Sequence, residues 1–197
     1  MLELKLEQVT EKHQLYKNTD LKINPGVTVL IGPNGSGKSY CLCQLKENFK
    51  DALLIDIVQE TANTSHQFPE GLDIGRWMCA SEGQRVYDHL ERLSTNVGKY
   101  VRYCKEEKID PIILIDGADS GVSPDLIQII RNFFNIVLED CEKSKMTCYI
   151  ICTANNFELV YDFNCIWMPT LENMTFDILN AGSYRDFRRL YLKPKNE

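Results

Sequence analysis

The pattern of apolar and polar residues predicts a series of β-strands separated by helices. The first residues, LELKLEQV, alternate between apolar and polar with a period of two, which is typical of a strand with one buried face. A second strand is expected within residues 16–23. Continuous apolar runs, typical of strands buried on both faces of a parallel sheet, occupy residues 27–32, 52–58, 112–116 and 147–154.

Helical patterns follow these runs. A helix is expected after residue 38, and a long one from about Ser81 to Glu107, where apolar residues recur at helical spacing. Ser123 and Pro124 are suited to the N-cap and first position of a helix that continues to about Lys143. The C-terminal part predicts a short helix near 156–161, two paired edge strands and a final helix at 183–192. This alternation predicts a single α/β domain, residues 1–197, around a mostly parallel sheet.

Composition narrows the classes of function. The chain has 197 residues and a net charge of −6, which argues against a surface that broadly coats nucleic acid. Its C-terminal end is locally basic, and this patch fits either a binding role, including DNA, or a solvated helix face. The patch comprises Arg185, Arg188, Arg189, Lys193 and Lys195.

No apolar run approaches the roughly 20 residues of a membrane span, and the N-terminus does not resemble a signal peptide. We therefore expect a cytoplasmic protein without a membrane partner. The eight cysteines include no C-x-x-C pair, which favours free thiols over a zinc site.

A glycine-rich loop stands between the strand at 27–32 and the helix that follows. The sequence from Gly32 to Ser39 matches G-x-x-x-x-G-K-[ST], whose backbone N–H groups wrap phosphates at a helix N-terminus. Lys38 is expected to reach the β- and γ-phosphates, and Ser39 to bind Mg²⁺. The predicted nucleotide-binding residues are Gly32, Pro33, Asn34, Gly35, Ser36, Gly37, Lys38, Ser39 and Tyr40.

Asp116 ends the strand IILID and is placed where phosphate-loop proteins hold Mg²⁺, usually through water. Lys38 and Asp116 are therefore candidate catalytic residues, with ATP and Mg²⁺ as cofactors. Together with the loop, Asp116 predicts a P-loop NTPase fold: a mostly parallel central sheet flanked by helices, with an antiparallel N-terminal β region.

Residues 80–85, ASEGQR, resemble the LSGGQ signature of ABC ATPases. The Ser81 hydroxyl, the Gly83 backbone and the helix N-terminus would form an anion site. In that family this site, here Ser81, Glu82, Gly83 and Gln84, meets the γ-phosphate held by the other subunit. The same residues also fit a capping box, with Ser81 as N-cap and Gln84 three residues later.

Other segments resemble the ABC family in order and spacing. SGVSPD at 120–125 resembles the D-loop, which crosses the dimer interface, and Gln59 is placed like the Q-loop glutamine that contacts metal and attacking water. The resemblance covers nearly the whole chain and implies an ATP-driven homo- or heterodimer. Tyr16 fits either an aromatic that stacks on adenine or a core tyrosine.

The interval between Lys38 and Ser81 is too short for the helical subdomain of ABC transporters or the coiled coil of chromosome-organising ATPases. The chain therefore looks like an ABC-type head of minimal size. It is similar to the small soluble "AAA-family" ABC-like ATPases of phages and bacteria, and to SMC-type heads without coiled-coil arms.

Two positions depart from the ABC pattern. Gly117 stands where the general-base glutamate is expected, and Ala154 or Asn155 stands where the switch histidine is expected. Glycine cannot accept a proton, and asparagine can donate a hydrogen bond but carries no charge. Slow hydrolysis with intact binding is therefore expected. Asp119, or Asp125 in the D-loop region, could replace the base through water or across a dimer. Asp119 could instead shape the D-loop.

Three functions follow. The first is an ABC-type ATPase with slow hydrolysis that drives a partner, such as a nuclease or a DNA-bound factor. The second is a hydrolysis-deficient module in which ATP locks a dimer, which Gly117 favours. The third is a small P-loop kinase, against which the chain shows no arginine-rich lid pattern and would carry the signature and D-loop by coincidence.

Overall fold

The computed structural model describes residues 1–7, 16, 19–57, 82–120, 122–177, 180 and 182–192. For residues 82–89 and 124–125 it describes the backbone alone.

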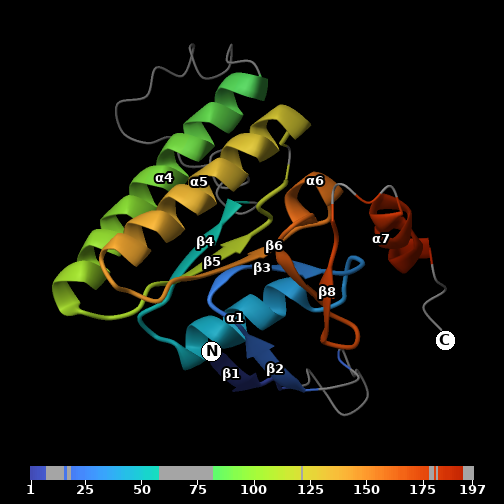
Figure 1. Ribbon diagram of the computed structural model, residues 1–197, viewed down its shortest axis with the longest axis horizontal. Coiled ribbons are helices and arrows are strands. Elements are labelled where there is room, and N and C mark those ends of the chain that lie inside the picture. The colour runs from blue at the N-terminus through green and yellow to red at the C-terminus, as the bar shows by residue number, and fades with distance from the viewer. Residues whose placement is uncertain are drawn as a thin grey trace, which may run out of the picture.

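The centre of the protein is a six-stranded sheet (Figure 1). Its strands are β3 (Gly26–Ile31), β4 (Leu53–Asp56), β5 (Ile112–Asp116), β6 (Tyr149–Thr153), β7 (Asn164–Trp167) and β8 (Glu172–Thr175). The spatial order is β4-β5-β6-β3-β7-β8, in which β8 is antiparallel to β7 and all other neighbours are parallel. The predicted mostly parallel sheet is therefore confirmed. Each apolar run forms a strand because helices cover both faces of the sheet.

A separate two-stranded sheet joins β1 (Leu2–Lys5) to β2 (Asp20–Ile23) in antiparallel register. This confirms the predicted antiparallel N-terminal β region. Leu21 and Ile23 on alternate positions of β2 are buried, and they pack in one cluster with Leu42 and Leu45 of the first helix.

The helices lie in two layers. On one face, α1 (Lys38–Asn48) packs beside the β1–β2 sheet; on the other, α4 (Glu82–Glu107) and α5 (Pro124–Lys143) lie side by side (Figure 1). The alternation of side chains along β3 serves both layers, since Leu30 packs in the α1 cluster whereas Val29 and Ile31 pack in the α4–α5 cluster. Two further helices, α6 (Phe157–Val160) and α7 (Ser183–Leu192), lie at the β7–β8 end of the sheet (Figure 1).

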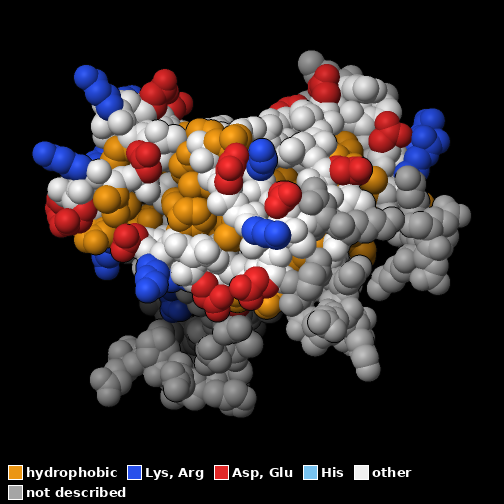
Figure 2. Space-filling model, turned by 90° about the horizontal axis from the view of Figure 1, so that it is seen from below, with side chains coloured by type: hydrophobic (Ala, Val, Ile, Leu, Met, Phe, Trp, Pro, Cys, Tyr) orange, Lys and Arg blue, Asp and Glu red, His pale blue; other side chains and the backbone are white. Residues whose placement is uncertain are grey.

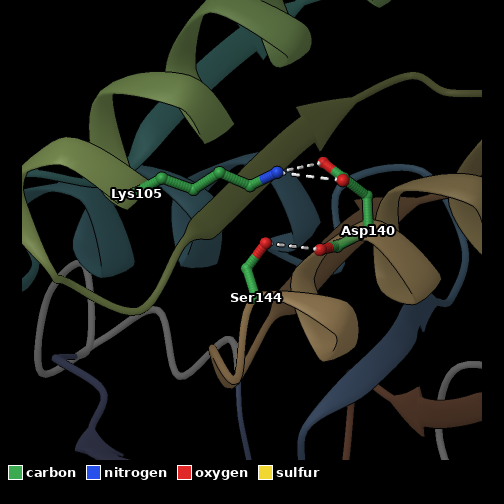
Figure 3. Close-up of polar contacts among 3 residues, drawn as sticks. All are labelled: Lys105, Asp140 and Ser144. Atoms are coloured by element: carbon green, nitrogen blue, oxygen red, sulfur yellow. Dashed lines mark hydrogen bonds and ion pairs between the residues drawn. The ribbon is translucent and has the colours of Figure 1, made fainter.

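An ion pair joins α4 to α5. The Lys105 ammonium contacts both carboxylate oxygens of Asp140, at 2.8 and 2.9 Å, and the Ser144 hydroxyl donates to the Asp140 carbonyl at 2.9 Å (Figure 3). Exposed pairs of this kind contribute about 1 kcal/mol at most. The buried residues of α4, such as Val97 and Val101, therefore contribute more to holding the two helices together.

Several boundaries differ from the sequence predictions. Strand β3 begins at Gly26, whose φ is 101°, and ends before Gly32. Ser123 occupies the N-cap position of α5 as predicted, but its hydroxyl makes no capping bond. Its carbonyl accepts hydrogen bonds from the backbone N–H groups of Leu126 and Ile127, each at 3.0 Å.

The seven described cysteines are free, and all but Cys43 are buried. Among the described helices, none has the length and apolar character needed to cross a membrane.

Candidate functional site

The glycine-rich loop connects the end of β3 to the start of α1. Gly37 has a φ of 86°, in the left-handed region that favours glycine. A Cβ atom at this position would also lie 2.6 Å from the Tyr16 hydroxyl oxygen. Two independent constraints, backbone conformation and packing, therefore require glycine directly before Lys38.

Tyr16 contacts this loop through its hydroxyl group. Its side chain is only 2% exposed, and its hydroxyl donates to the Gly37 carbonyl at 2.8 Å. Of the two roles considered for Tyr16, the structure supports the core tyrosine, because a buried ring offers no face on which adenine could stack. Sequence reasoning missed that its hydroxyl contacts the loop itself.

The Lys38 ammonium lies across the loop. It donates to the Gly32 carbonyl at 2.5 Å and to the Pro33 carbonyl at 3.3 Å. Burial lowers the pKa of Lys38, and the negative charges of Asp119 and Asp116 partly oppose this shift. The charges of both carboxylates therefore act on the Lys38 ammonium.

The donors of the loop fit a phosphate group. The Ser36 hydroxyl is buried and has no hydrogen-bond partner among the described residues. Helix α1 begins at Lys38 with no side-chain cap and no acidic residue in its first turn, so its amide donors and positive dipole end stay available. Ser39 is exposed at this end of the helix. A phosphate would satisfy this set of donors.

Asp116 is held by the neighbouring strand. The Thr153 hydroxyl donates to its carboxylate at 2.6 Å and accepts the Gly117 N–H at 2.7 Å. Because β6 lies between β3 and β5, Thr153 stands between the phosphate loop and Asp116. The oxygen donors of Ser39 and Asp116 are of the type that Mg²⁺ prefers. Thr153 was not among the predicted site residues.

Gly117 makes a turn directly after Asp116. It is buried, and its φ of 70° lies in the left-handed region. The residue at the expected general-base position therefore serves a backbone conformation that a side chain would strain. This conformation is a physical reason for glycine at position 117.

Asp119 bridges two loops. One of its carboxylate oxygens accepts the backbone N–H groups of Asn155 at 2.8 Å and Asn156 at 2.7 Å. This contact ties the segment after β5 to the segment after β6. Of the two residues considered for the switch, Ala154 is buried whereas Asn155 is exposed, so only Asn155 presents a side chain to solvent.

A second carboxylate lies beside Asp116. The parallel register pairs Asp56 with Asp116 at the ends of β4 and β5. Cys43 on α1 faces the same edge: burial raises its pKa, and the charges of Asp116, Glu47 and Asp56 raise it further. Asp56 was missed, although its position at the end of an apolar run was a usable signal.

A tyrosine from the C-terminal helix also reaches the loop. The Tyr191 hydroxyl accepts the Gly32 N–H at 3.2 Å, and its ring packs against Trp167 and Phe187. Burial raises the pKa of Tyr191 to about 12. The spacing of Phe187 and Tyr191 predicts a shared helix face, but no local signal indicates that this face meets the phosphate loop.

The signature and Q-loop residues are not tested by this geometry. Ser81 and Gln59 lie outside the described residues. Glu82, Gly83 and Gln84 are described as backbone of the first turn of α4, without side chains.

A comparison with protein families matches the chain to the AAA domain over residues 22–160. This segment includes the phosphate loop, Asp116 and Thr153. A comparison with curated proteins finds no match. AAA domains of the P-loop class are nucleotide-binding ATPase domains that generally bind ATP with Mg²⁺. The match covers more than half of the chain and agrees with the observed loop and sheet, so the chain belongs to the AAA domain family of P-loop NTPases.

Proposed function

We propose that this chain is an ABC-type ATPase that binds Mg-ATP in its phosphate loop and hydrolyses it slowly. The observation that carries the proposal is the convergence of donors at one end of α1. The Lys38 ammonium, the Ser36 hydroxyl and the first turn of α1 lie together here. Within the described part of the chain this hydroxyl has no hydrogen-bond partner and this turn has no side-chain cap. Thr153 holds Asp116 by a hydrogen bond from the neighbouring strand.

The residues divide the work of binding. The loop amides and the Ser36 hydroxyl would donate to phosphate oxygens, and the Lys38 ammonium would exchange its two carbonyl contacts for them. Ser39 and Asp116 would hold the cation, with Gln59 as a further ligand. When bound, Mg²⁺ supplies positive charge that stabilises the transferring phosphoryl group.

Slow hydrolysis follows from the residues near the expected base. Gly117 carries no proton acceptor, and the described carboxylate oxygen of Asp119 already accepts two backbone N–H groups. General-base catalysis contributes about 10²–10⁴-fold to enzyme rates. We therefore expect a rate reduced by a factor of this order relative to a head with a positioned glutamate.

The second half of the site would come from another subunit. Ser81, Glu82, Gly83 and Gln84 would meet the γ-phosphate across a homo- or heterodimer, with Asn155 as the switch residue. Hydrolysis would release the dimer and drive a partner such as a nuclease or a DNA-bound factor. On the face in Figure 2, basic and acidic side chains are interspersed. The support for DNA comes from the arginines of α7.

A second candidate is a module that binds ATP and dimerises without hydrolysis. The left-handed glycine at position 117 favours it, because that backbone disfavours any side chain that could serve as a base. The two candidates share the site and the dimer, and they differ in turnover alone.

Phosphate release from Mg-ATP by the purified protein tests the proposal, in single-turnover and steady-state form, with Lys38→Ala as control. Release above the control supports the ATPase, and Asp119→Asn then asks whether that carboxylate is the base. ATP binding without phosphate release supports the second candidate, the module that dimerises without hydrolysis. Unchanged ATP affinity in Lys38→Ala would contradict the site assignment.

A further inference from the structure

The C-terminal helix α7 contacts the phosphate loop through Tyr191. Its inner face carries Phe187 and Tyr191, whose ring centroids lie 5.1 Å apart. Phe187 packs against Phe157 at the start of α6 and against Phe176 just after β8, with centroids 5.6 and 5.5 Å away. Tyr191 extends past this cluster, and its hydroxyl accepts a hydrogen bond from the Gly32 amide.

This hydrogen bond falls at the start of the phosphate loop. Gly32 is buried, so its N–H depends on Tyr191 for the hydrogen bond that water would otherwise supply. The carbonyl of the same residue accepts from the Lys38 ammonium. The Gly32 backbone therefore connects α7, through Tyr191, to the lysine expected to hold phosphates.

The surroundings of Tyr191 fix its position. Its ring makes an edge-to-face contact with Trp167 at the end of β7, with centroids 5.5 Å apart. Burial raises the pKa of Tyr191, and the negative charge of Asp119, in the segment after β5, adds to this shift. Tyr191 therefore stands between β7, the phosphate loop and the segment after β5.

We propose that Tyr191 is a positioning residue for the phosphate loop, and that its bond to Gly32 couples the C-terminal helix to nucleotide binding. This inference rests on the proposed function, because the coupling requires that the loop bind a nucleotide. The bond holds the loop start in place before binding, so the nucleotide meets a preorganised site. By linkage, a nucleotide that fixes the loop also stabilises α7.

The decisive variant is Tyr191→Phe, which keeps the ring contacts with Trp167 and Phe187 and removes the hydroxyl alone. The matched control is Tyr184→Phe on the same helix. Tyr184 is half exposed, and its ring packs against Phe157 at 5.4 Å. Both variants remove one phenol oxygen from α7, but only the first removes a contact with the phosphate loop.

The first measurement uses the protein without nucleotide. Hydrogen exchange of the Gly32 amide, followed by NMR, is expected to be several-fold faster in Tyr191→Phe than in the wild type, and unchanged in Tyr184→Phe. Equal exchange in all three proteins would overturn the positioning role. This measurement tests the positioning role of Tyr191 whether or not the protein binds a nucleotide.

The second measurement is the affinity for Mg-ATP by titration calorimetry. One lost hydrogen bond of ordinary strength predicts roughly 2- to 12-fold weaker binding in Tyr191→Phe and no change in Tyr184→Phe. Unchanged or tighter binding in Tyr191→Phe would overturn the coupling. If the wild type binds no Mg-ATP, the proposed function and the coupling both fail, whatever the exchange of Gly32.

A third measurement leaves Tyr191 unchanged and follows the effect of the nucleotide on α7. Amide exchange across residues 183–192 of the wild type is expected to slow when Mg-ATP is added, and Lys38→Ala is expected to abolish this protection. Protection elsewhere in the chain without protection of α7 would show a nucleotide site that is not coupled to the helix, and would overturn the inference.

Discussion

The hydroxyl of Thr153 donates to Asp116 across the boundary between two parallel strands, at 2.6 Å. The same oxygen accepts the Gly117 N–H at 2.7 Å, so one hydroxyl fixes both the carboxylate and the turn that follows it. Thr153 is buried, and its contacts therefore cannot be replaced by bulk water.

Replacing Thr153 tests this arrangement. Thr153→Val keeps the shape of the side chain but leaves the Gly117 N–H without a partner, and we expect a loss of about 1–3 kcal/mol in the free energy of unfolding. Mg²⁺-dependent ATP binding should weaken as Asp116 loses its orientation. Urea denaturation and calorimetry at varied Mg²⁺ measure the two effects. Thr153→Ser retains the hydroxyl and should retain most of both properties; equal losses in the two variants would contradict the role of the hydroxyl.

The glycines of the phosphate loop offer a matched pair. A Cβ at position 35 would contact no other atom, so Gly35→Ala should lose stability only through its left-handed backbone at φ 78°. We expect this strain to cost about 1–2 kcal/mol in the free energy of unfolding. Gly37→Ala has similar backbone strain at φ 86° and also places a Cβ 2.6 Å from the Tyr16 hydroxyl oxygen. We expect Gly37→Ala to be the more destabilising in urea denaturation. Equal values would show that Tyr16 moves aside without cost.

A carboxylate can be introduced at position 117. Gly117→Glu and Gly117→Ala share the strain of a side chain at φ 70°, so their difference isolates the effect of the carboxylate. We expect both to lose similar stability, and phosphate release to be faster in the Glu variant than in the Ala variant. Equal rates would mean that the base comes from elsewhere, or that the local geometry excludes the attacking water.

The raised pKa of Tyr191 predicts a response to alkali. Between pH 10, the ordinary pKa of tyrosine, and about pH 12, the unfolded chain loses the phenol proton while the folded chain keeps it. The folded state then binds more protons, so the contribution of Tyr191 to stability falls as pH rises through this window. Stability curves of the wild type and Tyr191→Phe should converge there. Parallel curves across the window would contradict the burial of the phenol.

The proposed dimer depends on Ser81. Ser81→Arg should leave ATP binding by the monomer intact and prevent ATP-driven dimerisation, because a long charged side chain would block the second phosphate contact. Light scattering with and without Mg-ATP measures the association. Ser94→Arg, at an exposed position of α4, is the control. A dimer that still forms in Ser81→Arg would reduce Ser81 to a helix cap.

Local patterns predicted much of this fold for identifiable reasons. Continuous apolar runs predict strands β3, β5 and β6. The phosphate loop is predicted by glycine, lysine and serine at a spacing that few other structures require. The spatial order of the strands has no local signal, so the insertion of β6 between β3 and β5 was not predicted. Thr153 and Tyr191 were missed for the same reason, since each acts on a residue distant in the sequence.

Other sites had ambiguous local signals. A tyrosine near the N-terminus fits stacking and core packing equally well, and only the burial of Tyr16 decides between them. The sequence shows a glycine at position 117, but the positive φ of this residue follows from the turn and could not be read from residue type alone.

The order of the strands also determines how the site responds to unfolding. Asp116 ends β5, and Lys38 follows the loop after β3. These two strands are not neighbours, because β6 is hydrogen-bonded between them. A ligand that engages both ends of this arrangement therefore joins three strands across the sheet, and it loses its site as soon as any one of them separates. By mass action, such a ligand raises the melting temperature by an amount set by its concentration relative to its Kd. A thermal shift would thus report the integrity of the sheet as well as occupancy of the loop.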